Sequence, residues 1–328
     1  MARKRDNSES IRENEGEISL IRVIIAFIAA VVLIISVYKL VMILNNYEDS
    51  NNEYKEIESA FTSERETDGE IPDTVITPEI IDGQETGRYY EDAPVPVDVD
   101  WEHLKELNSD IVAWIYVESL PEISYPVVRG ENNSYYLHRT FTKQSKYAGS
   151  IFEDYHNARD FSDPNTIVYG HNMRNGSMFN HLKRLKNQET YEKSPYFWIL
   201  TPEGNYRYHI FSVYDTNPTG QVFTFFTPGY EGFQDWLEAR RKDSVVTSSI
   251  PLFADDNCVT LSTCTSDSKH RTVVLGVCCS TARPPKGQVP EWMIEEYEEE
   301  RQNDAGSEAE TSEEEMSGYS ASKNPYAR

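Results

Sequence analysis

The hydrophobic pattern of the chain starts with one long apolar segment near the N-terminus. Residues 23–37 read VIIAFIAAVVLIISV, and after Tyr38 and Lys39 the apolar run resumes as far as Leu44. About 20 such residues suffice to cross the ~30 Å hydrocarbon core of a bilayer. A cleaved signal peptide is the alternative, but its apolar core is shorter and a small-residue cleavage site follows it, whereas this run continues into NNYEDSNNE. The pattern therefore predicts a transmembrane signal-anchor over 20–44.

The charges on the two sides of this segment predict its orientation. Five basic residues lie between Arg3 and Arg22, whereas the residues after Leu44 are mainly acidic. Positively charged flanks remain on the cytoplasmic side of a membrane. We therefore expect a single-pass protein of the cell membrane, with residues 1–19 in the cytoplasm and everything after about residue 45 outside the cell.

Two further segments have no sustained hydrophobic period. Residues 45–97 combine many acids with four prolines, and residues 285–328 contain the run EEYEEERQNDAGSEAETSEEE. Like charges repel, and such segments lack the apolar surface needed to fold. We expect 45–97 to be an extended acidic spacer and 285–328 to be a disordered acidic tail, which would leave 98–284 as the folded catalytic domain. An alternative for the tail is that it occupies or gates the site, or recruits a basic partner.

Within 98–284 the pattern favours β-structure. An acidic N-cap near Asp100 begins a short helix with Trp101, Leu104 and Leu107 at helical spacing. The segments that follow are short, rich in β-branched and aromatic residues, and separated by turn-forming sequences. They cover 111–117, 150–152, 166–169, 197–201, 207–214, 259–263 and 272–277. So many short strands predict a closed β-barrel or a sandwich, with amphipathic helices over 177–185 and 232–246.

Composition and charge narrow the class of protein. The 328 residues include 55 Asp and Glu against 31 Lys and Arg; 17 of the acids lie in 47–100 and 12 in 291–315. A nucleic-acid-binding protein needs a basic stripe, and no segment has one. The acids do not converge with histidines, so we expect no metal and no cofactor. The four cysteines are too few and too clustered for a disulfide framework and form no Cys-x-x-Cys pair.

Candidate chemistry lies where predicted strands end. The strand TLSTC ends at Cys264, polar residues follow, and the next strand begins just after Arg271. If the two strands pair, the guanidinium could favour the thiolate and donate hydrogen bonds to an oxyanion. His171 follows the strand at 166–170 and is the best-placed base, since an imidazole can exchange a proton with a thiol at neutral pH. His270 is a rival base that the sequence leaves open, and an isolated cysteine can also serve as a small core residue, which is what we expect of Cys258, Cys278 and Cys279.

These residues and the motifs around them resemble the sortases, class B in particular. The motifs are TLSTC at Cys264, TVVLG after Arg271, VYGHNM around His171 with Met178-Phe179 beyond it, GSIFEDYHN (149–157), DIVAWIYV (110–117) and YPVVRGENNSYYL (125–137). Together they cover roughly residues 98–280. The membrane anchor and the acidic spacer fit the same family.

The resemblance implies an eight-stranded sortase β-barrel, mostly β, with an N-terminal helix and a long helix before the strand of the catalytic cysteine. It also implies a calcium-independent cysteine transpeptidase on the outer face of a Gram-positive membrane. Cys264 would attack after Thr in a sorting signal like Asn-Pro-x-Thr-Asn or Pro-x-Thr-Gly, and form a thioester. His171 would act as general acid and base, and Arg271 would stabilise the oxyanion.

The resemblance further implies the binding partners. Exported proteins with a sorting signal would be the substrates, and the amine of lipid II or of a peptidoglycan cross-bridge would receive them. Asn133, Leu137 and Ser262 fall where the family contacts its sorting peptide, and Val222 and Phe223 match the same surface.

Three alternatives remain at the level of sequence. A pilin-polymerising sortase would use a lysine amine in place of the cell-wall amine. An anchored adhesin or receptor domain would have no catalysis. A papain-like protease is disfavoured because its cysteine precedes its histidine and begins a helix, whereas here His171 precedes a cysteine that ends a strand.

Overall fold

The structure is a computed structural model that describes residues 3–64, 73–264, 269–304 and 320–322. It divides into two compact units, 1–49 and 50–328. Helix α1 (Arg3–Phe61) supplies the first unit and continues into the second. The helix is long and apolar enough from Arg22 onward to cross a membrane, and none of its most apolar window is buried by protein. It is therefore a candidate membrane span, in agreement with the expected anchor.

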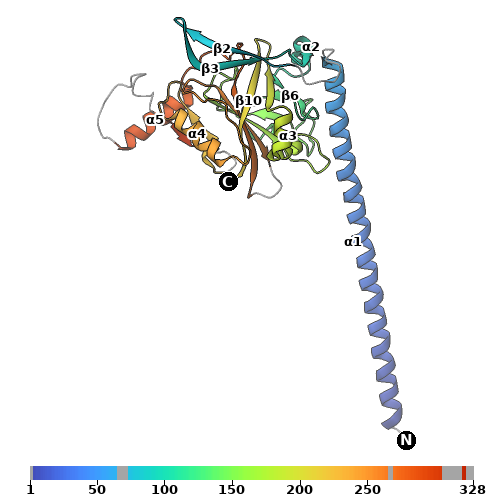
Figure 1. The fold of residues 1–328 in the computed structure, drawn as a ribbon. Helices are drawn as coiled ribbons and strands as arrows, with labels where there is room; N and C mark the ends of the chain where they lie inside the picture. The colour runs from blue at the N-terminus through green and yellow to red at the C-terminus, as the bar shows by residue number, and fades with distance from the viewer. Residues whose placement is uncertain (1–2, 65–72, 265–268, 305–319, 323–328) are drawn as a thin grey trace. The chain divides into compact units, whose positions relative to one another are not determined.

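The second unit contains a closed eight-stranded barrel, which confirms the expected fold (Figure 1). Its strands are β5 (Ile111–Val117), β6 (Ser124–Val128), β7 (Ile151–Glu153), β8 (Asn165–His171), β9 (Tyr196–Leu200), β10 (Asn205–Thr216), β12 (Cys258–Cys264) and β13 (Arg271–Cys278). They close in the order β10-β13-β12-β8-β7-β6-β5-β9. The pairs β6–β7 and β8–β12 are parallel, and the others are antiparallel.

Large side chains are buried on both faces of the barrel strands. Trp114, Phe197, Tyr208 and Phe211 are fully buried, and the rings of Phe197 and Tyr208 stack with centroids 5.1 Å apart. A Cβ at Gly276 would lie 2.5 Å from the Phe197 ring, so only glycine fits there. The β-branched and aromatic runs of the sequence form strands because these side chains pack well on a pleated surface that is buried on at least one face.

Short helices cover the barrel. Helix α2 (Trp101–Leu107) begins at Asp100, whose carboxylate accepts the His103 N–H as a helix cap. The other helices are η1 (Tyr136–His138), η2 (Phe179–Lys186), α3 (Gln188–Lys193), η3 (Gln221–Phe223) and α4 (Phe233–Asp243). The helix expected over 177–185 is the 3-10 segment η2, and the helix expected over 232–246 is the shorter α4, which packs against β10 (Figure 1).

The structure differs from the expected extended spacer over 45–97. Helix α1 continues to Phe61, β1 (Thr62–Glu64) pairs with β4 (Val97–Val99), and β2 (Val75–Ile81) forms a hairpin with β3 (Gln84–Asp92). The hairpin turns at Asp82 and Gly83, which both have positive φ, as a tight two-residue turn requires. Arg88 of the hairpin is buried against Asp255 and Asp256. Glu79, one of the acids of this segment, also pairs with the Arg88 guanidinium at 3.6 Å. An acid that suggested self-repulsion is thus a partner of a buried cation.

The C-terminal segment also departs from the expected disordered tail. Residues 291–304 form helix α5 (Glu291–Asp304), and β14 (Ser320–Ser322) pairs with β11 (Thr224–Phe226). Met293 is fully buried, and the Trp292 indole N–H donates to the His156 carbonyl at 2.8 Å. The Trp292 ring also meets the Phe225 ring edge-on at 5.5 Å. These apolar residues at the start of the acidic run explain why the segment docks.

Replacement of Trp292 by alanine is expected to release α5 from the barrel. The change removes one hydrogen bond and the aromatic contacts, and should lower the free energy of opening the helix by about 2 kcal/mol. Hydrogen exchange of residues 291–299 would measure this, with protection in β8 unchanged. Exposed Glu295 lies on the same helix, so Glu295→Ala is the matched control. Wild-type exchange in Trp292→Ala would contradict the assigned docking role.

Candidate active site

Three neighbouring strands bring the candidate catalytic residues to the same end of the barrel. His171 is the last residue of β8 and Cys264 the last of β12, and in the parallel pairing of these strands the two residues are direct partners. Arg271 is the first residue of β13, which runs antiparallel to β12 with Ser262 opposite Val273. Because the strands are antiparallel, Cys264 lies two residues after Ser262 and Arg271 lies two residues before Val273 toward the same end of the barrel. The backbone therefore aligns all three residues at one barrel end, although they lie up to 100 positions apart in sequence.

The imidazole of His171 is held by a backbone carbonyl. Its Nε2 lies 2.7 Å from the Leu137 oxygen, and its ring stacks on the His138 ring with centroids 5.7 Å apart. A carbonyl can only accept, so Nε2 carries the proton, and in the neutral ring Nδ1 is the atom able to accept one. A Cβ at Gly170 would lie 2.5 Å from Ile151 and 2.6 Å from Phe179. Glycine is thus required for the close packing that leads into His171.

Arg271 and His270 lie next to each other but in different environments. Arg271 is half-buried, and its backbone pairs with Thr216 of β10. Its guanidinium donates to the His270 carbonyl at 3.4 Å. His270 itself is exposed and precedes the strand. The strand register therefore favours His171 over His270 as the base beside Cys264, and the rest of the intervening loop, residues 265–268, lies outside the described residues.

Leu137 and Ser262 lie at this barrel end, whereas Asn133 contacts the connection that follows β7. Asn133 is buried, and its Oδ1 accepts the Tyr155 N–H at 3.0 Å. Leu137 is half-buried and supplies the carbonyl that bonds His171. Ser262 is fully buried two residues before Cys264, and its hydroxyl has no hydrogen-bond partner within the described part of the chain. Successive strand residues alternate between faces, so positions 262 and 264 share one face of β12.

Val222 and Phe223 lie in η3, which contacts β8. Both side chains are buried in η3. The Val222 carbonyl accepts a hydrogen bond from the side chain of Asn165. Asn165 is the first residue of β8, and His171 is the last residue of the same strand. The Phe223 ring stacks over Tyr169 with centroids 6.4 Å apart. The structure thus groups Leu137 and Ser262 with the candidate catalytic residues. It places Asn133 beside the β7–β8 connection and Val222 near the opposite end of β8 from His171.

The remaining cysteines lie in the protein core. Cys258, Cys278 and Cys279 are buried and form no disulfide. Burial raises the pKa of Cys278 to about 11 and raises the pKa of Cys258 and of Cys279 well above the usual range for a thiol. These thiols remain protonated at neutral pH, and the thiolate is the nucleophilic form. Core positions were expected for all three. Among the described residues, no group of three or more His, Cys, Asp or Glu side chains could hold a metal ion.

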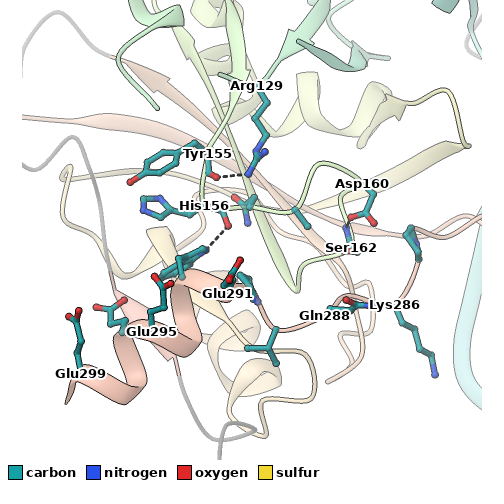
Figure 2. Close-up of a pocket in the computed structure, with 17 residues that line it drawn as sticks. Arg129, Tyr155, His156, Asp160, Ser162, Lys286, Gln288, Glu291, Glu295 and Glu299 are labelled. Atoms are coloured by element: carbon teal, nitrogen blue, oxygen red, sulfur yellow. Dashed lines mark hydrogen bonds between the residues drawn. The ribbon is translucent and has the colours of Figure 1, made fainter. Parts of the chain in front are cut away.

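A separate pocket, which the sequence did not indicate, lies between the β7–β8 connection and the C-terminal segment (Figure 2). Its volume is about 940 Å³, and its lining includes Arg129, Tyr155, His156 and Trp292. Figure 2 shows Arg129 donating to the Tyr155 carbonyl, and the Trp292 indole donates to the His156 carbonyl. Neither His171 nor Arg271 lines this pocket. Its walls depend on the docked α5, so only the structure could reveal it.

Asp163 is a buried acid in the connection that borders this pocket. Its Oδ2 accepts from Asn157 at 2.7 Å and from the Ala158 N–H at 2.8 Å, while Oδ1 has no partner among the described residues. Burial raises the pKa of Asp163 from 3.8 to about 6. Between about pH 4 and pH 6 the folded protein therefore keeps a proton that the unfolded chain releases, and the free energy of unfolding falls as pH rises.

The raised pKa of Asp163 predicts that the difference in stability between the wild type and Asp163→Asn depends on pH. The wild type should lose about 2 kcal/mol of stability relative to the variant between pH 4 and pH 7, because the amide does not titrate. Urea unfolding of both proteins across this range would measure the difference. A difference that stays constant with pH would contradict the buried, protonated state of Asp163.

Comparison with known proteins identifies the family. The sortase domain family matches residues 115–278. Sortase B of Listeria monocytogenes is 37% identical over 176 residues, which cover 53% of this chain and 71% of that protein. A Staphylococcus aureus sortase B–substrate complex superposes with a TM-score of 0.53 and 30% identity, over 56% of this chain and 86% of that one.

A second solved structure covers more of the chain. Sortase B from B. anthracis in complex with AAEK1 gives a TM-score of 0.57 at 26% identity, over 73% of this chain and 100% of that one. The family match over residues 115–278 and the superposition on sortase B structures thus lead to the same family. The chain belongs to the sortase family of cysteine transpeptidases, and within it to class B.

Proposed function

We propose that this chain is a membrane-anchored transpeptidase in which Cys264, His171 and Arg271 carry out the reaction. The observation that carries the proposal is the strand register, which makes Cys264 and His171 direct partners and aligns Arg271 at the same barrel end. The substrate is an exported protein whose C-terminal sorting signal resembles Asn-Pro-x-Thr-Asn or Pro-x-Thr-Gly. The S. aureus relative solved as a substrate complex supports a peptide-like substrate.

The reaction has two steps. In the first, the Cys264 thiolate attacks the carbonyl carbon of Thr, the C–N bond breaks, and the imidazolium of His171 gives a proton to the leaving amine. In the second, an acceptor amine attacks the thioester, His171 takes a proton from it, and the C–S bond breaks to restore the Cys264 thiolate beside the His171 imidazolium. Arg271 donates hydrogen bonds to the oxyanion of both tetrahedral intermediates.

The N-terminal helix supports the location of this chemistry. Helix α1 is a candidate span, and the basic residues before it favour a cytoplasmic N-terminus. The catalytic unit then lies outside the cell of a Gram-positive bacterium, where sorting substrates and lipid-linked amines share the same membrane. Confinement to one surface raises their effective concentration, which favours transfer to the amine over hydrolysis by water.

The acceptor amine is tested by its product. The full chain is incubated with a labelled sorting peptide and either a cell-wall precursor amine or a pilin-derived lysine peptide, and mass spectrometry identifies what is attached to Thr. We expect the cell-wall adduct. A lysine adduct would favour the pilin-polymerising alternative. A non-enzymatic binding domain would give neither product, and its ligand binding would not change when Cys264 is alkylated.

A further inference from the structure

The C-terminal end of helix α1 packs against the segment whose backbone carbonyl bonds the His171 ring. Ser50, Tyr54 and Ile57 of α1 are buried within the second unit. Glu53 and Tyr54 of the same helix bond to residues 141, 142 and 149, within the connection between β6 and β7 that contains Leu137. The Leu137 carbonyl is the hydrogen-bond partner of His171 Nε2. Helix α1, which is a candidate membrane span from Arg22 onward, thus ends against the connection whose Leu137 carbonyl bonds the proposed catalytic base.

Two side chains of the helix bind this connection. The Tyr54 hydroxyl donates to the Gly149 carbonyl at 2.7 Å and accepts the Phe141 N–H at 3.2 Å. The Glu53 carboxylate accepts both the N–H and the hydroxyl of Thr142, at 3.2 and 2.7 Å. The Tyr54 ring also meets the Tyr125 ring edge-on at 5.5 Å. These contacts hold the connection at two places, at residues 141 and 142 and at Gly149 just before β7.

Gly149 transmits this contact to Leu137. It has a φ of +57°, and a Cβ at its position would lie 2.4 Å from the Leu137 oxygen. The next residue, Ser150, donates its N–H to the Tyr136 carbonyl at 3.0 Å. The backbone at Gly149 therefore lies directly behind the carbonyl that bonds His171. A shift of Gly149 cannot occur without a shift of that carbonyl, because packed atoms leave no space between them.

We propose that Tyr54 is a positioning residue: through Gly149 it fixes the Leu137 carbonyl, and so the orientation and the Nε2–H tautomer of His171. This inference rests on the proposed role of His171 in proton transfer. The bond made by one ring nitrogen decides which nitrogen can accept a proton. A displacement of about 1 Å in a reacting group can lower the rate by about 100-fold.

The test compares two tyrosine variants of the full chain in detergent. Tyr54→Phe keeps the ring but removes the hydroxyl, and should lower kcat about tenfold while KM for the sorting peptide stays within about twofold. Tyr191→Phe is the matched control, since the Tyr191 hydroxyl also bonds a buried backbone carbonyl, that of Ile210 at 2.9 Å, but lies on α3. The control should keep its kcat even where it unfolds at a lower temperature.

A spectroscopic measurement separates positioning from stability. The ¹⁵N shifts of the His171 ring should report one Nε2–H tautomer in the wild type and in Tyr191→Phe, and a mixture in Tyr54→Phe. Gly149→Ala, which pushes directly on the Leu137 carbonyl, should give the same mixture if it folds. Wild-type ring shifts in Tyr54→Phe, or an equal loss of kcat in both tyrosine variants, would overturn the inference. Full activity of His171→Ala would instead overturn the proposed function, and the ring shifts of Tyr54→Phe would still decide the positioning contact.

Discussion

Cys264→Ala is expected to abolish transfer of a sorting peptide, with a rate reduced by a factor on the order of 10⁶. Without the sulfur no thioester can form, and direct attack by the amine on a peptide carbonyl is far slower. The variant should fold as the wild type does, because alanine is tolerated at the last position of a strand whose pairing depends on backbone groups. A peptide-cleavage assay and thermal unfolding measure the two effects.

A buried cysteine serves as the control for this experiment. Cys278 is fully enclosed, and burial raises the pKa of its thiol to about 11. Cys278→Ala should lower stability by about 1 kcal/mol through the cavity that it leaves, while the folded fraction keeps its activity. Residual transfer by Cys264→Ala at more than a few per cent of the wild-type rate would contradict the assignment of the nucleophile.

Arg271→Lys is expected to lower kcat/KM by about 10² to 10³-fold at unchanged net charge. A guanidinium presents a planar fork of donors to the carbonyl oxygen as it becomes an oxyanion, and a single ammonium cannot reproduce that geometry. The loss should appear mainly in kcat, because the charge develops only in the transition state. Steady-state kinetics with a quenched sorting peptide would measure it.

The same substitution at an exposed arginine provides the comparison. Arg174 lies three residues after His171 and is exposed. Arg174→Lys should leave both kcat and KM close to the wild-type values. If Arg271→Lys were as active as Arg174→Lys, the guanidinium would not be the stabiliser of the oxyanion, and another donor at the barrel end would have to be sought.

Much of the fold could be predicted because the relevant signals are local. Alternating and β-branched residues at 111–117 and 259–263 indicate strands, and a helical spacing of Phe233, Trp236 and Leu237 indicates the helix that the structure confirms. The candidate nucleophile could be found because a cysteine ends a strand. Those features depend on a few adjacent residues, for which propensity and period are informative.

Features that depend on distant partners could not be predicted in this way. Arg88 can be buried because its guanidinium bonds Asp255 and Asp256, which lie more than 160 positions away in sequence. The docking of α5 depends on Trp292 and Met293, whose apolar signal is small beside the surrounding acids. The pairing of Cys264 with His171 rather than His270 depends on strand order. Such contacts are decided by tertiary packing, which charge counts and periodicity do not contain.

The most direct test of the whole account is intact-protein mass spectrometry of the acyl-enzyme. The full chain is mixed with a sorting peptide in the absence of an acceptor amine and quenched in acid, where thioesters survive. We expect the protein to gain the mass of the peptide through Thr, with the adduct mapped to Cys264 and lost on treatment with hydroxylamine. No adduct in a folded sample that binds the peptide, or an adduct on a residue other than Cys264, would contradict the account.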